Sequence, residues 1–227
     1  MLLKSTFTIF SILFVSYATI KSNINTNRKQ LSQSYKIATN KSGSSNSEQA
    51  KQSLNQVREK FTNHLVSDII PQWYGTKWSF DGYSEVPKSG SIACGYFVST
   101  TIRDMGMNIN RYKLAQKAPY HEAKVIACGS TIETLQNKTK EELKAYFIAN
   151  KQDGLYFIGL DFHVGFLLKE DKNIYFIHSN YLNNSGPTKE KIEESKVMKS
   201  NVYHFCNITH NDVLLKKWLN NEVVTTN

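Results

Sequence analysis

The chain has 227 residues, 40% of them hydrophobic and 12% aromatic, which is enough for one domain with tails and too little for two full domains. Its formal net charge is +9, but residues 19–65 hold eight basic and two acidic side chains, so the charge belongs mainly to one N-terminal segment. Basic and aromatic residues are not interleaved, which argues against a nucleic-acid partner. We interpret the basic segment as a solvated linker, with contact to an anionic envelope polymer as the alternative.

The first 18 residues have the pattern of an export signal. Lys4 supplies the positive start, an apolar run extends from Thr6 to Tyr17, and Ser16-Tyr17-Ala18 resembles a cleavage site. The run is shorter than the roughly 20 residues of a membrane span, so we expect cleavage after Ala18 rather than an uncleaved anchor. The sequence thus predicts an exported protein of the periplasm, cell envelope or extracellular space, with no stable membrane span after cleavage.

Composition divides the remaining chain into a linker and one domain. Residues 19–47 are rich in Asn, Ser, Lys and Gln, which predicts a disordered basic linker. Residues 48–227 are expected to form a single domain. It begins with a helix from Ser47 to about Ile69, because apolar residues recur every three or four positions until Pro71. These residues are Leu54, Val57, Phe61, Leu65 and Ile69.

Cys94 is predicted to occupy the first turn of the next helix. A turn-rich segment with three glycines and Pro87 precedes it, and apolar residues then follow at helical spacing until Gly106. A short helix is expected over residues 110–117. The sequence Thr139-Lys140-Glu141-Glu142 is a capping box that opens a helix to about Asn150.

Beyond residue 150 the pattern is typical of strands. Four β-rich runs are expected at residues 155–160, 163–168, 173–179 and 201–208, and Asn211 can cap a final helix through Trp218. The predicted fold class is therefore α+β, with the helix that carries Cys94 packed on an antiparallel sheet.

The second and third runs form a predicted hairpin that brings two histidines together. A two-residue turn at Glu170-Asp171, or a four-residue loop, places Leu168 opposite Asn173 and His163 opposite His178. Both rings then lie on one face of the sheet, within reach for one imidazole to accept the N–H of the other.

Three cysteines are an odd number for an exported chain, which favours one free thiol. Cys128 and Cys206 could form a bridge or be two inert core thiols. No paired Cys or His/Cys cluster indicates a zinc site. We therefore expect Cys94 to be the reactive thiol, because a helix N-terminus and a nearby imidazole both favour the thiolate.

These residues define a candidate catalytic set of Cys94, His163 and His178, acting as nucleophile, base and orienting residue. Asn180 is the alternative orienting residue, in the manner of Cys/His/Asn sites, and Asp161 is a weaker one. The backbone N–H of Cys94 is the expected first donor to an oxyanion, and the second donor is not assigned.

Several segments of the chain resemble the motifs of NlpC-like papain-fold cysteine peptidases over residues 66–180. They are Gly75-Thr76-Lys77-Trp78-Ser79-Phe80-Asp81-Gly82, Cys94-Gly95-Tyr96-Phe97-Val98, Asp104-Met105-Gly106, His163-Val164-Gly165 and Phe176-Ile177-His178-Ser179. The resemblance implies a papain-like (NlpC-type) domain, with a nucleophilic Cys94, a basic His163 and an orienting His178. The chain departs from the family pattern at Ala93-Cys94-Gly95-Tyr96, where the family has Asp-Cys-Ser-Gly, and at Trp78, where it has Tyr.

The resemblance also implies an activity. It predicts an exported, monomeric thiol hydrolase that needs no cofactor or metal and cleaves an amide in the peptide stems of bacterial peptidoglycan. The two alternatives are a papain-like amidase with a non-wall amide substrate and a catalytically inactive domain that binds the wall.

Overall fold

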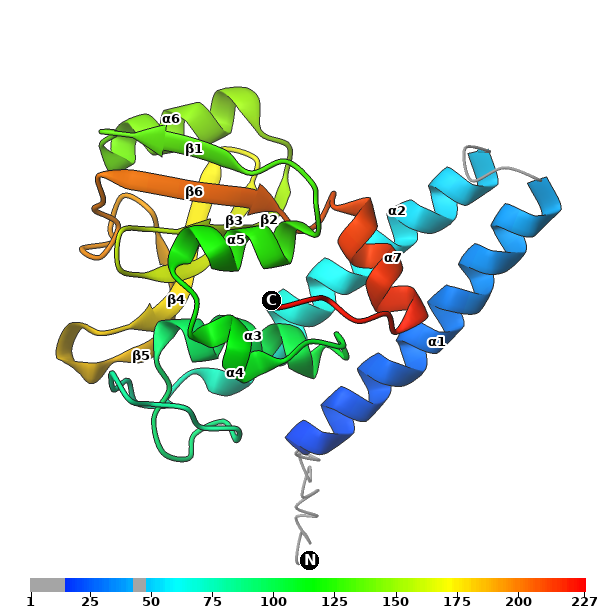
Figure 1. Ribbon diagram of the computed structural model, residues 1–227, viewed down its shortest axis with the longest axis horizontal. Helices are drawn as coiled ribbons and strands as arrows, with labels where there is room; N and C mark the ends of the chain where they lie inside the picture. The colour runs from blue at the N-terminus through cyan, green and yellow to red at the C-terminus, as the bar shows by residue number, and fades with distance from the viewer. Residues whose placement is uncertain (1–14, 43–47) are drawn as a thin grey trace, which may run out of the picture.

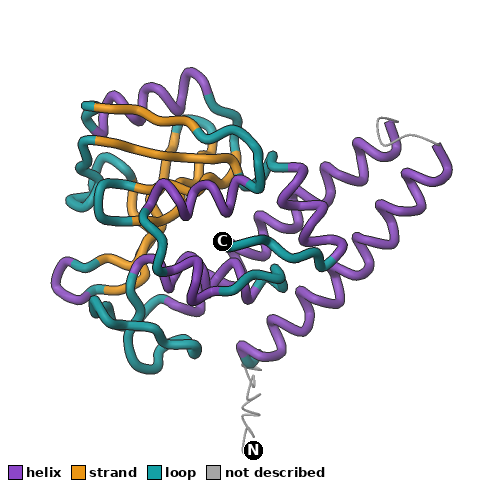
Figure 2. The backbone as a smooth tube through the Cα atoms, in the orientation of Figure 1, coloured by secondary structure: helices purple, strands orange, loops and turns teal. Residues whose placement is uncertain are grey.

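The protein is described by a computed structural model for residues 15–42 and 48–227. Its fold is α+β, and the described part contains a six-stranded sheet in the order β1-β6-β2-β3-β4-β5, with every neighbouring pair antiparallel. Figure 2 shows the strands gathered on one side of the molecule and the long helices on the other. The strands are β1 (Glu133–Gln136), β2 (Gly154–Gly159), β3 (Val164–Glu170), β4 (Asn173–Asn180), β5 (Gly186–Lys191) and β6 (Val202–Asn207).

Helices cover both faces of this sheet and extend away from it (Figure 1). Those described are α1 (Tyr17–Ser42), α2 (Glu48–Asn63), α3 (Cys94–Asp104), α4 (Arg111–Ala115), α5 (Pro119–Ala127), α6 (Lys140–Asn150) and α7 (Asp212–Asn220). Short π and 3₁₀ turns, η1 (His64–Ile69) and η2 (Ile70–Trp73), continue α2, and η3 (Leu182–Asn184) joins β4 to β5.

Two hydrophobic cores lie on the two faces of the sheet. The larger one joins α2, α3, α5 and α7 to side chains such as Phe157, Phe166 and Ile177. The smaller one packs Leu143 and Phe147 of α6 against the opposite side chains of the same strands. This double cover explains why β2 and β3 are continuous apolar runs, because strands buried on both faces lose the usual alternation.

Where the sequence predicted a disordered linker over residues 19–47, the structure instead has α1 as far as Ser42. Its apolar residues are few but fall three, four or seven positions apart, which keeps them on one face, and Ile24 is buried in the larger core. The guanidinium of Arg28 donates to the backbone oxygen of Trp218 at 2.9 Å. Tertiary contacts of one narrow stripe therefore stabilise a helix whose composition alone is typical of a linker. Residues 43–47 of the predicted linker lie outside the described residues.

The predicted export signal falls mostly outside the described residues, since the description begins at residue 15. Its last two residues, Tyr17 and Ala18, are the first two of α1. The Tyr17 hydroxyl donates to Asp104 at 2.7 Å and accepts from the indole of Trp73 at 3.0 Å. Cleavage after Ala18 would remove these contacts. No helix in the described ranges is long and apolar enough to cross a membrane.

Most of the elements predicted after residue 47 are present with boundaries within a few residues. The capping box at Thr139 is confirmed, with Thr139 accepting from the Glu142 N–H and the Glu142 carboxylate accepting in return. The sequence did not predict α5, β1 and β5. Two of these missed elements carry residues that shape the candidate site described below.

The hairpin register differs from the prediction. The structure pairs Glu170 with Asn173 and Leu168 with Tyr175, so the turn is Asp171-Lys172 and the register is shifted by two residues. Asp171 takes a positive φ of 55°, which this residue type tolerates in tight turns, and its N–H donates to Asp153. Because the shift is an even number of residues, His163 and His178 remain on one face of the sheet.

Candidate active site

Cys94 begins α3, as the sequence predicted, and the helix end is open. The preceding residue, Ala93, is extended, and its methyl side chain cannot cap the N–H groups of the first turn. Gly95 lets this end of α3 pack closely against Ala115 of α4, because a Cβ added at position 95 would lie 2.5 Å from the carbonyl oxygen of Ala115. The half-buried thiol therefore sits at the positive end of the helix dipole.

The two histidines of the hairpin are hydrogen-bonded to each other. The distance from His163 Nε2 to His178 Nδ1 is 2.8 Å, and the rings stand almost perpendicular with centroids 5.0 Å apart. The His178 ring also stacks on Phe176 at 4.0 Å. A glycine at position 165 leaves room for His178 on the neighbouring strand, since a Cβ added to Gly165 would lie only 2.9 Å from the Cβ of His178.

A third residue, Glu190, continues this chain of contacts. It lies on β5 opposite Phe176, and its Oε1 is 3.1 Å from His178 Nε2. The hydrogen bond with His178 lowers the pKa of Glu190 below its usual range, so the side chain is a carboxylate at neutral pH. The result is a relay of three side chains, with His163 directly before β3, His178 on β4 and Glu190 on β5.

The ionised Glu190 determines which nitrogen of each ring carries a proton. A carboxylate only accepts, so His178 Nε2 donates to it, and the neutral His178 ring then has Nδ1 as an acceptor. His163 Nε2 must donate to that acceptor. The proton-free nitrogen of neutral His163 is therefore Nδ1, which is the form of imidazole that can remove a proton from a thiol.

Cys94 and His163 line the same cavity of about 210 Å³. The backbone N–H of Val164, directly after His163, hydrogen-bonds to the Cys94 sulfur and partly offsets the effect of burial on its pKa. The cavity is lined by Trp78, Phe80, Ala93, Cys94, Gly95, Tyr96, Ala115, Phe162, His163 and Tyr181. A larger cavity of about 570 Å³ beside α6 includes none of the candidate catalytic residues. We therefore take the smaller cavity as the candidate active site, because it is the one that contains Cys94 and His163.

Burial keeps the thiol and both imidazoles neutral in the free protein. It raises the pKa of Cys94 above its ordinary value, and it lowers the pKa of His163 well below 6.5, with the charge of His178 adding to the effect. Burial also lowers the pKa of His178, which the hydrogen bond with Glu190 partly offsets. The resting site is thus a thiol and a neutral base that line one cavity, and a proton transfer must accompany attack by sulfur.

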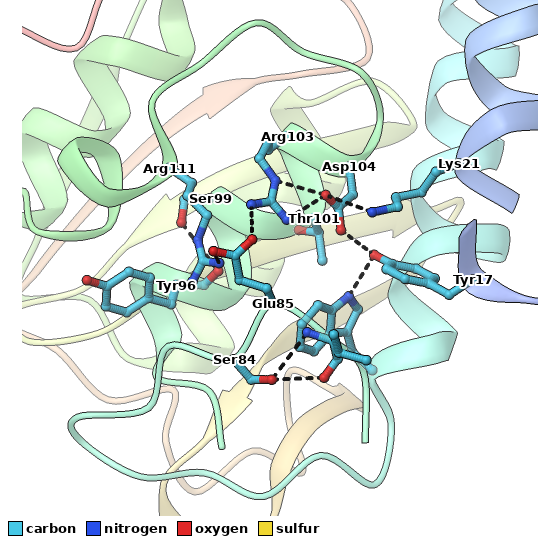
Figure 3. Close-up of polar contacts among 12 residues, drawn as sticks. Tyr17, Lys21, Ser84, Glu85, Tyr96, Ser99, Thr101, Arg103, Asp104 and Arg111 are labelled. Atoms are coloured by element: carbon cyan, nitrogen blue, oxygen red, sulfur yellow. Dashed lines mark hydrogen bonds and ion pairs between the residues drawn. The ribbon is translucent and has the colours of Figure 1, made fainter. Parts of the chain in front are cut away.

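An ion-pair cluster, shown in Figure 3, holds the loop that carries Trp78 and Phe80. Glu85 of this loop accepts from Arg103 at 2.9 Å and pairs with the buried Arg111 at 3.3 Å. The Arg111 guanidinium lies over the ring of Tyr96, which lines the cavity. Arg103 also pairs with Asp104, whose carboxylate accepts from Tyr17 of α1. The cluster thus connects the N-terminal helix to one wall of the cavity.

Glu122 is a second carboxyl group close to the thiol. It lies on α5, is 1% exposed, and neither carboxyl oxygen has a hydrogen-bond partner among the described residues. Burial raises its pKa well above the usual value, so the group is neutral at ordinary pH. A charge on Glu122 would raise the pKa of Cys94 further. Keeping Glu122 protonated therefore keeps a negative charge away from the sulfur.

The remaining predicted residues have other partners. Asn180 accepts from the N–H of Leu182 at 2.8 Å and shapes the turn after β4, so His178 is the residue that contacts His163. Asp161 accepts from the backbone of Asn201 and Val202 and fixes the start of β6. Trp78 lines the cavity.

Cys128 and Cys206 are both free thiols, so of the two alternatives that the sequence left open the structure has unbridged cysteines. In the described ranges, no group of three or more His, Cys, Asp and Glu side chains is placed to hold a metal ion.

Sequence reasoning missed Glu190 because it missed β5. This strand, Gly-Pro-Thr-Lys-Glu-Lys, is polar and contains no residue with strong strand preference except Thr188. The available signal was spacing, since Thr188 and Glu190 alternate with lysines after the turn that follows His178.

Comparisons with known proteins return no match for this chain among family models, curated proteins or solved structures. The site is therefore interpreted from its own geometry.

Proposed function

We propose that the protein is a papain-like cysteine hydrolase that cleaves an amide bond by acyl transfer through Cys94. The observation that carries this proposal is the relay from Glu190 through His178 to His163, with His163 and Cys94 facing one cavity. Buried histidines often serve only to complete a core. Here, the carboxylate fixes both tautomers so that His163 keeps a proton-free nitrogen in a cavity that it shares with a thiol at a helix N-terminus.

The chemistry follows from these positions. His163 Nδ1 takes the thiol proton as Cys94 Sγ attacks the carbonyl carbon, and the negative charge that develops on oxygen is stabilised at the open end of α3, first by the Cys94 N–H. The imidazolium of His163 then protonates the leaving nitrogen as the C–N bond breaks. A thioester and a free amine result.

Water completes the reaction. His163, neutral again, removes a proton from a water molecule that attacks the thioester carbonyl, and the thiol leaves with that proton. The products are a carboxylic acid and the starting enzyme. His178 and Glu190 do not touch the substrate in this scheme; they hold the tautomer of His163 and stabilise its cationic form, as positioning residues.

The first substrate class to test is the peptide stem of peptidoglycan, which the motif resemblance and the predicted export of the protein both favour. Purified sacculi are incubated with wild type, Cys94→Ser and Cys128→Ser, and soluble fragments are identified by mass spectrometry. Cys128 is a matched control because it is a half-buried free thiol outside the cavity. We expect wild type and Cys128→Ser to release the same fragments and Cys94→Ser to release none.

Other outcomes select among the alternatives. Equal release by Cys94→Ser would overturn the hydrolase proposal. Cosedimentation of the protein with sacculi without any cleavage would indicate a catalytically inactive domain that binds the wall. A thioester on Cys94 detected by mass spectrometry with other amides, but no action on sacculi, keeps the chemistry and moves the substrate away from the wall.

A further inference from the structure

The cavity at Cys94 contains no strongly charged side chain. None of its ten lining residues is Asp, Glu, Lys or Arg, and five of them are aromatic residues other than histidine. These five are Trp78, Phe80, Tyr96, Phe162 and Tyr181. A charged substrate group placed here would lose its hydration and find no ion-pair partner in the wall, which is strongly unfavourable.

Two of these aromatic residues are almost fully exposed. Phe80 is 82% exposed and Phe162 is 97% exposed, although each lines the cavity. They come from different loops, since Phe80 precedes α3 and Phe162 lies between β2 and β3 directly before His163. Single exposed apolar residues are common on protein surfaces, but two phenylalanines and the exposed Tyr181 at one cavity form a patch, and such patches mark binding surfaces.

We propose that this cavity binds an uncharged apolar group of the substrate, an aromatic or branched aliphatic side chain next to the scissile amide. The inference rests on the hydrolase chemistry of the proposed function. Because the stems of peptidoglycan carry alanine and charged residues, an apolar site favours the alternative in which the substrate is a non-wall amide. A volume of about 210 Å³ suits one such side chain. Binding would cover Phe80 and Phe162 and remove their exposed surface from water, which favours apolar groups and disfavours acidic or basic ones.

The test uses a series of N-acetylated peptide amides that differ only in the residue on the acyl side of the scissile bond: Phe, Leu, Ala, Glu or Lys. We expect kcat/KM for the Phe or Leu peptide to exceed that for the Glu or Lys peptide about ten- to hundredfold, the range expected for burying one large apolar side chain. Faster cleavage of the Glu or Lys peptide would overturn the inference while leaving the hydrolase proposal intact.

Variants locate the preference in the protein. Phe162→Ala and Phe80→Ala are expected to reduce the preference for Phe over Glu about tenfold, mainly through a higher KM for the Phe peptide. Ile148→Ala on α6 is the control, because it also shortens an exposed apolar side chain but lies outside the cavity. An unchanged preference in the Phe80→Ala/Phe162→Ala double variant would also contradict the inference.

A binding measurement separates failure of this inference from failure of the proposed function. Cys94→Ala is titrated with the Phe and Glu peptides by isothermal calorimetry. Binding of the Phe peptide alone supports the apolar site even if the wild type cleaves no peptide, in which case only the hydrolase proposal fails. Binding of neither peptide, or tighter binding of the Glu peptide, overturns the apolar site.

Discussion

Two carboxyl groups of the candidate site have opposite environments and therefore opposite chemical states. Glu190 lies at the end of the histidine relay, accepts from His178 and is ionised. Glu122 is completely buried, has no partner among the described residues and is neutral. The comparison shows that hydrogen-bonding partners determine whether a carboxyl group supplies charge to the site or withholds it.

The largest expected effect comes from changing the partnered carboxylate. Glu190→Gln keeps the size of the side chain but removes the charge that orients His178, and the amide can donate as well as accept. We expect kcat/KM to fall about 10²- to 10⁴-fold, the usual contribution of a positioned base, because His163 loses its fixed tautomer. The matched control is Glu193→Gln, because the Glu193 carboxylate pairs with Lys144 and lies outside the relay. This variant should retain activity. Full activity of Glu190→Gln would remove the relay from the mechanism.

Local sequence patterns predicted much of the Cys/His part of this site. Glycine spacing and helical periodicity located the start of α3, and strand patterns placed His163 and His178 on one face even though the register was wrong by two residues. The prediction tolerated this error because side-chain direction in a strand depends only on whether a shift is odd or even.

The two carboxyl groups could not be placed from sequence, for different physical reasons. Glu190 belongs to a polar edge strand that forms because it pairs with β4, so its own residues carry little strand signal. Glu122 follows Pro119 in the first turn of α5, where an acidic residue ordinarily faces solvent and favours the helix dipole. Only the packing of α5 against β2 and β6 shows that it is buried.

The unpartnered carboxyl group should affect stability rather than rate. The pKa of Glu122 is higher in the folded than in the unfolded state. Its contribution to the free energy of unfolding is therefore complete at a pH below the pKa of the unfolded state. That contribution is lost as the pH rises toward the pKa of the folded state. Glu122→Gln has no proton to lose. We expect the two proteins to be similar near pH 4.5 and the variant to be more stable by about 1–3 kcal/mol at pH 8, measured by urea denaturation.

A solvent-exposed carboxylate provides the comparison for that measurement. Glu59→Gln on α2 changes the same functional group at the surface, and its stability relative to wild type should stay within about 0.5 kcal/mol at both pH values. A stability difference between Glu122→Gln and wild type that is independent of pH would show that Glu122 is not titrating in a buried, neutral state.

The smallest effect, about tenfold per pH unit, is expected in the acid limb of the rate profile. Burial lowers the pKa of His163 well below 6.5, so the base stays neutral and kcat/KM stays level as pH falls from 8 to 6.5. Below the folded pKa, protonation of Nδ1 removes the base. Glu122→Gln should leave this limb in place, because Glu122 is already protonated there. An acid limb centred at 6.5 or above in wild type would show that His163 is not desolvated in the working enzyme. The resting site would then be a thiolate and imidazolium ion pair instead of a neutral thiol and a neutral imidazole.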